Sequence, residues 1–135
     1  ARKIISQYQQ EFISKGQYLY ISDIPDNGLQ VAILNGITDP YMIMQLAETN
    51  GANHELMTTD IIEQLKKWDT AFGIRVTGIG FDFCECTIVN KDIDYNSLAA
   101  GIYQFCPDVV DQGTETVEAL EEELKKTGSI FLWWD

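Results

Sequence analysis

Apolar side chains recur at two different spacings along the chain, and the changes in spacing predict where helices alternate with strands. At residues 4–13 they recur every three or four positions, as on one face of an α-helix, and Gly16 is expected to end that helix. Residues 18–23 and 29–35 are rich in β-branched and aromatic side chains, and residues 25–28 (Pro-Asp-Asn-Gly) between them favour a tight turn. This stretch therefore predicts a helix followed by a β-hairpin.

Two helices are predicted between residues 39 and 73. The Asp-Pro pair at 39–40 has the residue types of an N-cap and a first helical position, and the Asn-Gly pair at 50–51 is expected to end that helix. Asp60, followed three residues later by Glu63, predicts a capping box that opens the second helix. Gly73 lies just past its expected end.

A second hairpin and two further helices follow. Residues 74–78 and 82–89 predict the two strands, with glycines at the turn between them. Apolar positions in residues 98–105 predict a helix that Pro107 terminates. Thr116 has the residue type of an N-cap and predicts the start of the last helix.

The chain closes on an apolar run that predicts a final strand. Alternation divides its side chains between two faces: Ile130, Leu132 and Trp134 on one, and Phe131, Trp133 and Asp135 on the other. Because both faces carry large apolar groups, we expect a strand buried on two sides, in the centre of a sheet. The two tryptophans are therefore expected to have different roles.

Together these elements predict an α+β fold in a single domain, residues 1–135. The sheet is expected to be mixed and to contain about five strands, built from the two hairpins plus the C-terminal central strand. Helices are expected on one or both faces. No linker or low-complexity stretch divides the chain.

The two faces of the predicted sheet differ in polarity. We expect the helix-facing side to carry Leu19, Ile21, Val31, Ile33, Ile74, Val76, Cys84, Cys86 and Ile88. The opposite face would then carry Tyr18, Tyr20, Ala32, Leu34, Thr77, Phe83 and a C-terminal aromatic residue. This second face is half apolar, so either the N-terminal helix covers it or it is a contact surface.

The net charge of the chain makes some classes of binding partner less favourable than others. The 135 residues include 9 basic and 21 acidic side chains, a formal net charge of −12, which disfavours nucleic acid and anionic membranes. The charge is consistent with simple solubility or with a basic protein partner. No apolar run approaches the roughly 20 residues of a membrane span, and the first residues do not have the pattern of a signal peptide.

The cysteine residues and the histidine give little support for a disulfide or a zinc site. On a strand, Cys84 and Cys86 would lie roughly 6.5–7 Å apart, which is poor disulfide geometry, so reduced thiols and a cytoplasmic location are expected. With Cys106 and His54 they have the ligand types of a zinc site, but Cys-x-Cys on a strand splays badly for one tetrahedral ion. No metal or cofactor is expected, and His54 is interpreted as an exposed or loop-fixing residue.

Acidic residues gather before the last helix. The carboxylates of Asp108, Asp111 and Glu115, with Asp135 at the chain end, could hold a divalent cation, but the spacing lacks a calcium-loop pattern. Acidic groups ahead of a helix N-terminus are also stabilised by the helix dipole. The capping interpretation is therefore preferred.

Two sequence motifs identify a family resemblance. Residues 103–108 (Tyr-Gln-Phe-Cys-Pro-Asp) with 111–113 (Asp-Gln-Gly), and residues 132–135 (Leu-Trp-Trp-Asp), resemble a bacterial family of domains of unknown function, family 4253. The resemblance covers residues 38–135 and implies a cytoplasmic bacterial protein with no established activity or cofactor. It marks as motif positions Cys106, Pro107, Asp108, Asp111, Gln112, Gly113, Trp134 and Asp135.

These motif positions include the candidate binding residues: Cys106, Asp108, Asp111, Gln112, Trp134 and Asp135. A structural role explains each of them, since Pro107 stops a helix and the polar side chains can hold the loop backbone. A surface loop beside a tryptophan is also typical of a binding site. In either case, we expect the two motifs to lie close together in space.

The leading hypothesis is a small acidic cytoplasmic interaction module without catalytic activity. One version is an immunity-type or regulatory protein that neutralises a basic partner, and a homodimer is the other form of association considered. The alternative is a small-ligand-binding or enzymatic domain that uses the 106–113 loop with Trp134 and Asp135. A third is an accessory domain of a longer chain, since the sequence does not begin with Met.

Overall fold

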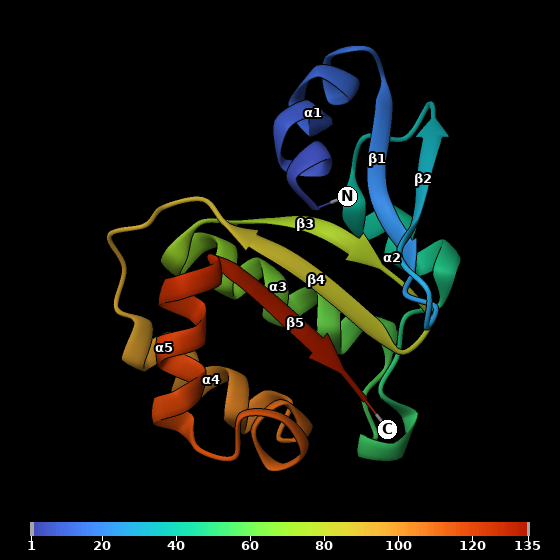
Figure 1. The fold of residues 1–135 in the computed structure, drawn as a ribbon. Helices are drawn as coiled ribbons and strands as arrows, with labels where there is room; N and C mark the ends of the chain where they lie inside the picture. Colours follow the sequence, from blue (N-terminus) through green and yellow to red (C-terminus); the bar gives the residue numbers. More distant parts are fainter. Residues whose placement is uncertain (1, 135) are drawn as a thin grey trace.

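A mixed five-stranded sheet in the order β2-β1-β3-β4-β5 organises the molecule (Figure 1). The computed structural model describes residues 2–134. The strands are β1 (Gln17–Asp23), β2 (Gln30–Asn35), β3 (Ile74–Ile79), β4 (Phe83–Ile88) and β5 (Ser129–Trp133). The helices are α1 (Arg2–Ser14), α2 (Pro40–Ala47), α3 (Thr58–Phe72), α4 (Tyr95–Phe105) and α5 (Val117–Thr127). Two short turns complete the fold: the 3-10 turn η1 (Ala52–His54) and the π-helical turn η2 (Val110–Thr114). The predicted α+β class is confirmed.

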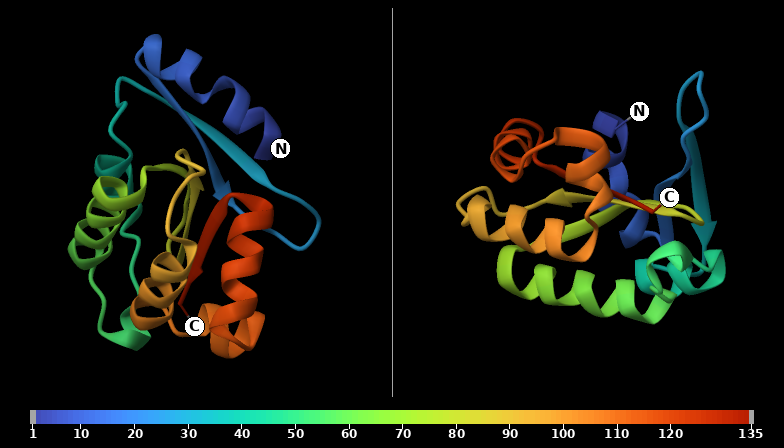
Figure 2. Two further views of the ribbon diagram at one scale, coloured as in Figure 1. Left: turned by 90° about the vertical axis from the view of Figure 1, so that its left-hand side faces the viewer. Right: turned by 90° about the horizontal axis from the view of Figure 1, so that it is seen from below.

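Helices cover the two faces of the sheet unequally. The main core lies on one face, where α2, α3 and α4 pack against the sheet, while α1 packs against β1 on the other (Figure 2). Helix α5 lies beside β5 at the sheet edge and contacts α4. Among the described residues, no helix is both long enough and apolar enough to span a membrane.

The final strand lies at an edge of the sheet, so its predicted central position is wrong. Strand β5 pairs antiparallel with β4 and is the last strand in the order. Its Ile130, Leu132 and Trp134 side chains are buried in the main core, whereas Phe131 and Trp133 on the other face are half-buried. The apolar residues on the second face are therefore only partly covered, and two-sided burial was the wrong inference from their alternation.

The predicted faces are right for β3 and β4 and wrong for the first hairpin. Tyr18 packs in the main core with Val76, whereas Leu19 and Ile21 pack against α1. Strand β1 meets β3 in parallel through one pairing, Ile21 with Gly78, and this long-range register decides which side chains face the core. The alternation within a strand cannot supply that choice.

Helix α1 is fastened to the sheet where β1 and β3 diverge. The Gln9 amide nitrogen donates hydrogen bonds to the Leu19 and Val76 carbonyl oxygens, each at 2.9 Å. The Tyr18 hydroxyl donates to the same Val76 oxygen at 2.6 Å, and burial raises the Tyr18 pKa well above its ordinary value. These bonds satisfy carbonyls that the sparse β1–β3 pairing leaves without strand partners. Helix α1 thus covers the β1 side of the second face, while Phe131 and Trp133 on the same face of β5 stay half-buried.

Most predicted helix ends are confirmed. The Asp39 and Thr116 side chains cap α2 and α5 by accepting backbone N–H bonds. Asp60 is not the N-cap of α3, because the helix begins at Thr58 and the Asp60 carboxylate accepts a bond from the Met57 N–H. Helix α2 ends at Ala47 rather than at the Asn-Gly pair, since the next residue already has a positive φ.

Candidate functional site

The two sequence motifs meet at the end of β5, as predicted. The Cys106 thiol donates a hydrogen bond to the Trp133 carbonyl oxygen at 3.0 Å. The Phe105 ring meets the Trp134 ring edge-on, with centroids 6.1 Å apart. A Cβ atom at Gly113 would lie 3.0 Å from Cη2 of Trp133, so this glycine allows η2 to approach the indole. We call this contact region the motif junction: residues 105–113 with Trp133 and Trp134.

Trp134 fills a slot in the fold. Its side chain lies between Phe105 and Gly51, and a Cβ atom at Gly51 would lie 2.7 Å from the indole Cγ. Only 4% of the residue is exposed, and its backbone N–H donates to the Asp82 carbonyl. The indole Nε1 is buried and has no hydrogen-bond partner among the described residues. The segment around Gly51 is thus a third part of the junction, which the sequence did not reveal.

Asp108 connects two turns that are distant in sequence. Its Oδ2 lies 3.0 Å from Nε2 of His54 in η1, and its Oδ1 accepts a bond from the Gln112 amide at 3.3 Å. The His54 side chain is partly buried and Asp108 is buried. This agrees with a loop-fixing histidine, but no local pattern could identify a partner 54 residues away.

The remaining candidates are placed differently. Asp111 accepts a hydrogen bond from the Tyr103 hydroxyl at 3.0 Å, and this bond raises the Tyr103 pKa. Both residues are exposed. Asp135 lies outside the described residues. Cys106, Asp108, Gln112 and Trp134 therefore make the contacts within the motif junction, and Asp111 is an exposed residue of it.

All three cysteines are buried and reduced. Burial raises the pKa of Cys106 to about 11 and raises the pKa values of Cys84 and Cys86 further. A neutral thiol is a poor nucleophile and a poor metal ligand. Within residues 2–134, no group of three or more His, Cys, Asp or Glu side chains is arranged to hold a metal ion.

These pKa shifts predict slow thiol labelling and a loss of stability at high pH. At pH 8 about one Cys106 thiol in a thousand would be ionised, so a disulfide reagent should label the native protein slowly and label three thiols after unfolding. Above the ordinary thiol pKa of 9 the unfolded chain loses protons first, so the free energy of unfolding should fall as pH rises from 9 towards 11. Rapid native labelling of Cys106 at pH 8 would contradict this placement.

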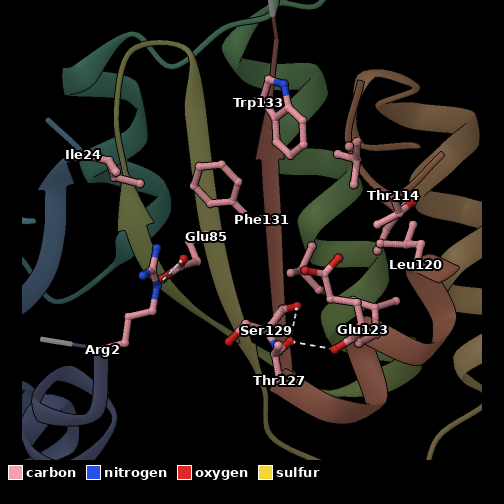
Figure 3. Close-up of a pocket in the computed structure, with 15 residues that line it drawn as sticks. Arg2, Ile24, Glu85, Thr114, Leu120, Glu123, Thr127, Ser129, Phe131 and Trp133 are labelled. Carbon is pink, nitrogen blue, oxygen red and sulfur yellow. Dashed lines mark hydrogen bonds and ion pairs between the residues drawn. The ribbon is translucent and has the colours of Figure 1, made fainter. Parts of the chain in front are cut away.

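A cavity of about 780 Å³ adjoins the motif junction (Figure 3). It lies over β5, between α5 on one side and β4 with the first turn of α1 on the other. Its walls combine apolar and aromatic side chains with three charged ones, Arg2, Glu85 and Glu123. Gly113 and Trp133 belong both to this wall and to the motif junction, so the two features are continuous.

Glu85 is the most unusual residue of the cavity. Its side chain is 5% exposed, and Oε1 accepts a bond from Nε of Arg2 at 2.8 Å, although the Arg2 side chain is 51% exposed. Gly78 on β3 makes room for it, because a Cβ atom there would lie 2.9 Å from Cβ of Glu85. Sequence reasoning missed this residue. The signal was available, since an acidic residue between two buried cysteines lies on the opposite face of an inner strand.

Aromatic rings line the cavity next to this carboxylate. The Phe83 and Phe131 rings are stacked with centroids 5.8 Å apart, and the Phe131 and Trp133 centroids are 5.5 Å apart. Phe131 and Trp133 line the cavity, and Phe131 is the cross-strand neighbour of Glu85. Aromatic faces beside a carboxylate suit an organic cation, because the ring quadrupole and the negative charge both attract it.

Comparison with known families confirms the family resemblance. A model described as "Domain of unknown function (DUF4253)" matches residues 31–135. The chain belongs to this family. The DUF4253 segment contains Glu85, β5, α5 and the whole motif junction, whereas all of α1, with Arg2, and all of β1 precede it. No curated protein and no solved structure matches the chain.

Proposed function

We propose that this DUF4253 protein is a binding module for a basic protein partner, which docks on the face of β4 and β5 between α1 and α5. The observation that carries the proposal is the Glu85 carboxylate, buried in the wall of an open, aromatic-lined cavity. A buried charge is costly unless it is paired, and the half-exposed Arg2 pairs with this one in the free protein, which indicates that the carboxylate accepts a cation from the cavity side.

The charge of the whole chain supports a basic partner over a second copy of the chain. With a net charge of −12, two copies repel each other, whereas a basic protein is attracted and its encounter rate is raised. Glu123, exposed on the cavity wall, adds negative charge at the docking face itself.

The motif junction supports binding rather than catalysis. Its thiol is neutral and donates to a backbone carbonyl, and its Asp108 carboxylate is held by His54 and Gln112. The described titratable groups of the cavity wall are Arg2, Glu85 and Glu123, which suit recognition of charge. In this proposal the motif junction holds the end of β5 in place and so positions Phe131 and Trp133.

The proposed setting is the bacterial cytoplasm, where the three thiols would remain reduced. Two roles fit an acidic module that occupies the surface of a basic protein: neutralisation of a toxic partner and regulation of a cellular one. In both, the docking face would cover a basic surface of the partner and block its other contacts.

A charge-reversal pair on α5 tests the proposal. Wild-type protein and two variants, Glu123→Lys on the cavity wall and Glu122→Lys one residue away, serve as baits in native lysate. We expect a basic protein to be retained by wild type and Glu122→Lys, and its measured affinity to fall about tenfold or more with Glu123→Lys. Both positions are exposed, so equal melting temperatures are expected.

Three outcomes would contradict the proposal. One is that no basic protein is retained at moderate salt. Another is that the retained protein binds both variants equally. The third is that sedimentation shows self-association that Glu123→Lys abolishes, because the face would then join two copies of this chain.

A further inference from the structure

We infer that the cavity receives an arginine side chain of the basic partner and that Arg2 occupies part of this site in the free protein. The inference rests on the proposed function and specifies the group that is recognised. It assigns Glu85 as the anionic anchor, Phe131 and Trp133 as the aromatic wall, and Arg2 as an internal competitor.

The Arg2–Glu85 contact shows which chemistry the anchor accepts. The Nε–H of a guanidinium group meets the carboxylate at 2.8 Å, within the range of a charge-assisted hydrogen bond. Glu85 is almost wholly buried, whereas half of the Arg2 side chain is exposed. The carboxylate is thus a fixed feature of β4, and the Arg2 side chain extends to it from the start of α1 (Figure 3).

Arg2 can leave without loss of the helix that carries it. It belongs to the first turn of α1, whereas the buried contacts of that helix come from Ile5 and Gln9. An incoming guanidinium group can therefore replace Arg2 on Glu85 while α1 stays docked. The buried carboxylate is then paired with a guanidinium group both before and after binding, so its desolvation is not an added cost of binding.

Besides the carboxylate that Arg2 contacts, the cavity has further features that suit the arginine side chain of a partner. Phe131 lies beside Glu85 and Trp133 lies beyond it, so a planar guanidinium group near Glu85 can stack on an aromatic ring. Glu123 lies on the opposite wall, toward α5, and the cavity volume of about 780 Å³ leaves room for the side chain. An anion would meet two carboxylates, and an uncharged ligand that displaced Arg2 would leave Glu85 unpaired.

The test uses a minimal probe, N-acetyl-arginine amide, with its uncharged isostere N-acetyl-citrulline amide. Binding to the full chain is followed by NMR titration. For a ligand of this size we expect a Kd on the order of 1 mM for wild type. Arg2→Ala should bind the arginine probe about tenfold more tightly, since the site is no longer occupied. Lys3→Ala removes the same charge from the same turn and should change the Kd by less than about twofold.

A second variant, Glu85→Gln, removes the charge of the anionic anchor, and Glu122→Gln is its matched control. We expect Glu85→Gln to weaken the arginine probe by about tenfold or more, and Glu122→Gln to leave it unchanged. Equal effects of Arg2→Ala and Lys3→Ala would overturn the competitor role. Citrulline binding as tight as arginine binding would overturn cation recognition. If the arginine probe fails while Glu123→Lys still abolishes partner capture, the arginine site is wrong and the docking face stands.

Discussion

Replacing Trp134 by alanine is expected to lower the free energy of unfolding by about 3–5 kcal/mol, the usual cost of truncating a large buried aromatic side chain. The indole is 4% exposed and packs between Phe105 and Gly51, so little of the surrounding structure can collapse into the space. Urea unfolding followed by circular dichroism would measure the change.

Trp133→Ala is the matched control, because it removes the same side chain one position away. Trp133 is half-buried and faces the cavity, so its loss should cost less stability and should weaken the arginine probe. If Trp134→Ala were as stable as the parent protein, the packing of Trp134 between Phe105 and Gly51 would not be what stabilises the end of β5.

The second large effect is expected at Gly51. A methyl group there would lie 2.7 Å from Trp134 Cγ, and the indole has Phe105 beside it, so Gly51→Ala should cost about 1–3 kcal/mol through overpacking. Gly101→Ala is the control. Gly101 lies within α4 and its nearest neighbour would be at 3.4 Å, so alanine there should not lower stability.

A double-mutant cycle identifies the cause. In a Trp134→Ala background the added methyl group at position 51 has space, so Gly51→Ala should then cost much less than in wild type. Additive costs would show that the glycine is required for some reason other than the indole.

Much of the fold could be predicted because its signals are local. The three- and four-residue spacing predicts α1, α3 and α4, the Pro-Asp-Asn-Gly turn predicts the first hairpin, and Asp39 and Thr116 cap their helices as expected. Each depends on residues within a few positions of one another, where backbone preferences and short hydrogen bonds dominate.

The order and register of the strands could not be predicted in the same way. The edge position of β5 follows from the course of the chain through α4 and α5, and the faces of β1 follow from its pairing with β3. Alternation fixes which side chains share a face, but long-range packing decides which face enters the core.

The candidate site was predicted in part. The convergence of the two motifs was expected, and Cys106, Asp108, Gln112 and Trp134 do lie in that region. The contributions of Gly51 and His54 depend on contacts across more than 50 residues, for which the sequence has no marker. Glu85 could have been identified, because its neighbours Cys84 and Cys86 predict an inner strand with an acidic residue on its other face.

The central claim is that recognition takes place in the cavity rather than in the motif loop, and the indole N–H signals of the three tryptophans test it directly. Trp68, Trp133 and Trp134 each give one signal, assigned through single Trp→Phe variants. On addition of N-acetyl-arginine amide, we predict that the Trp133 signal shifts while those of Trp68 and Trp134, buried in the main core, stay in place. A shift of the Trp134 signal with Trp133 unchanged would contradict the account and place the site at the motif loop.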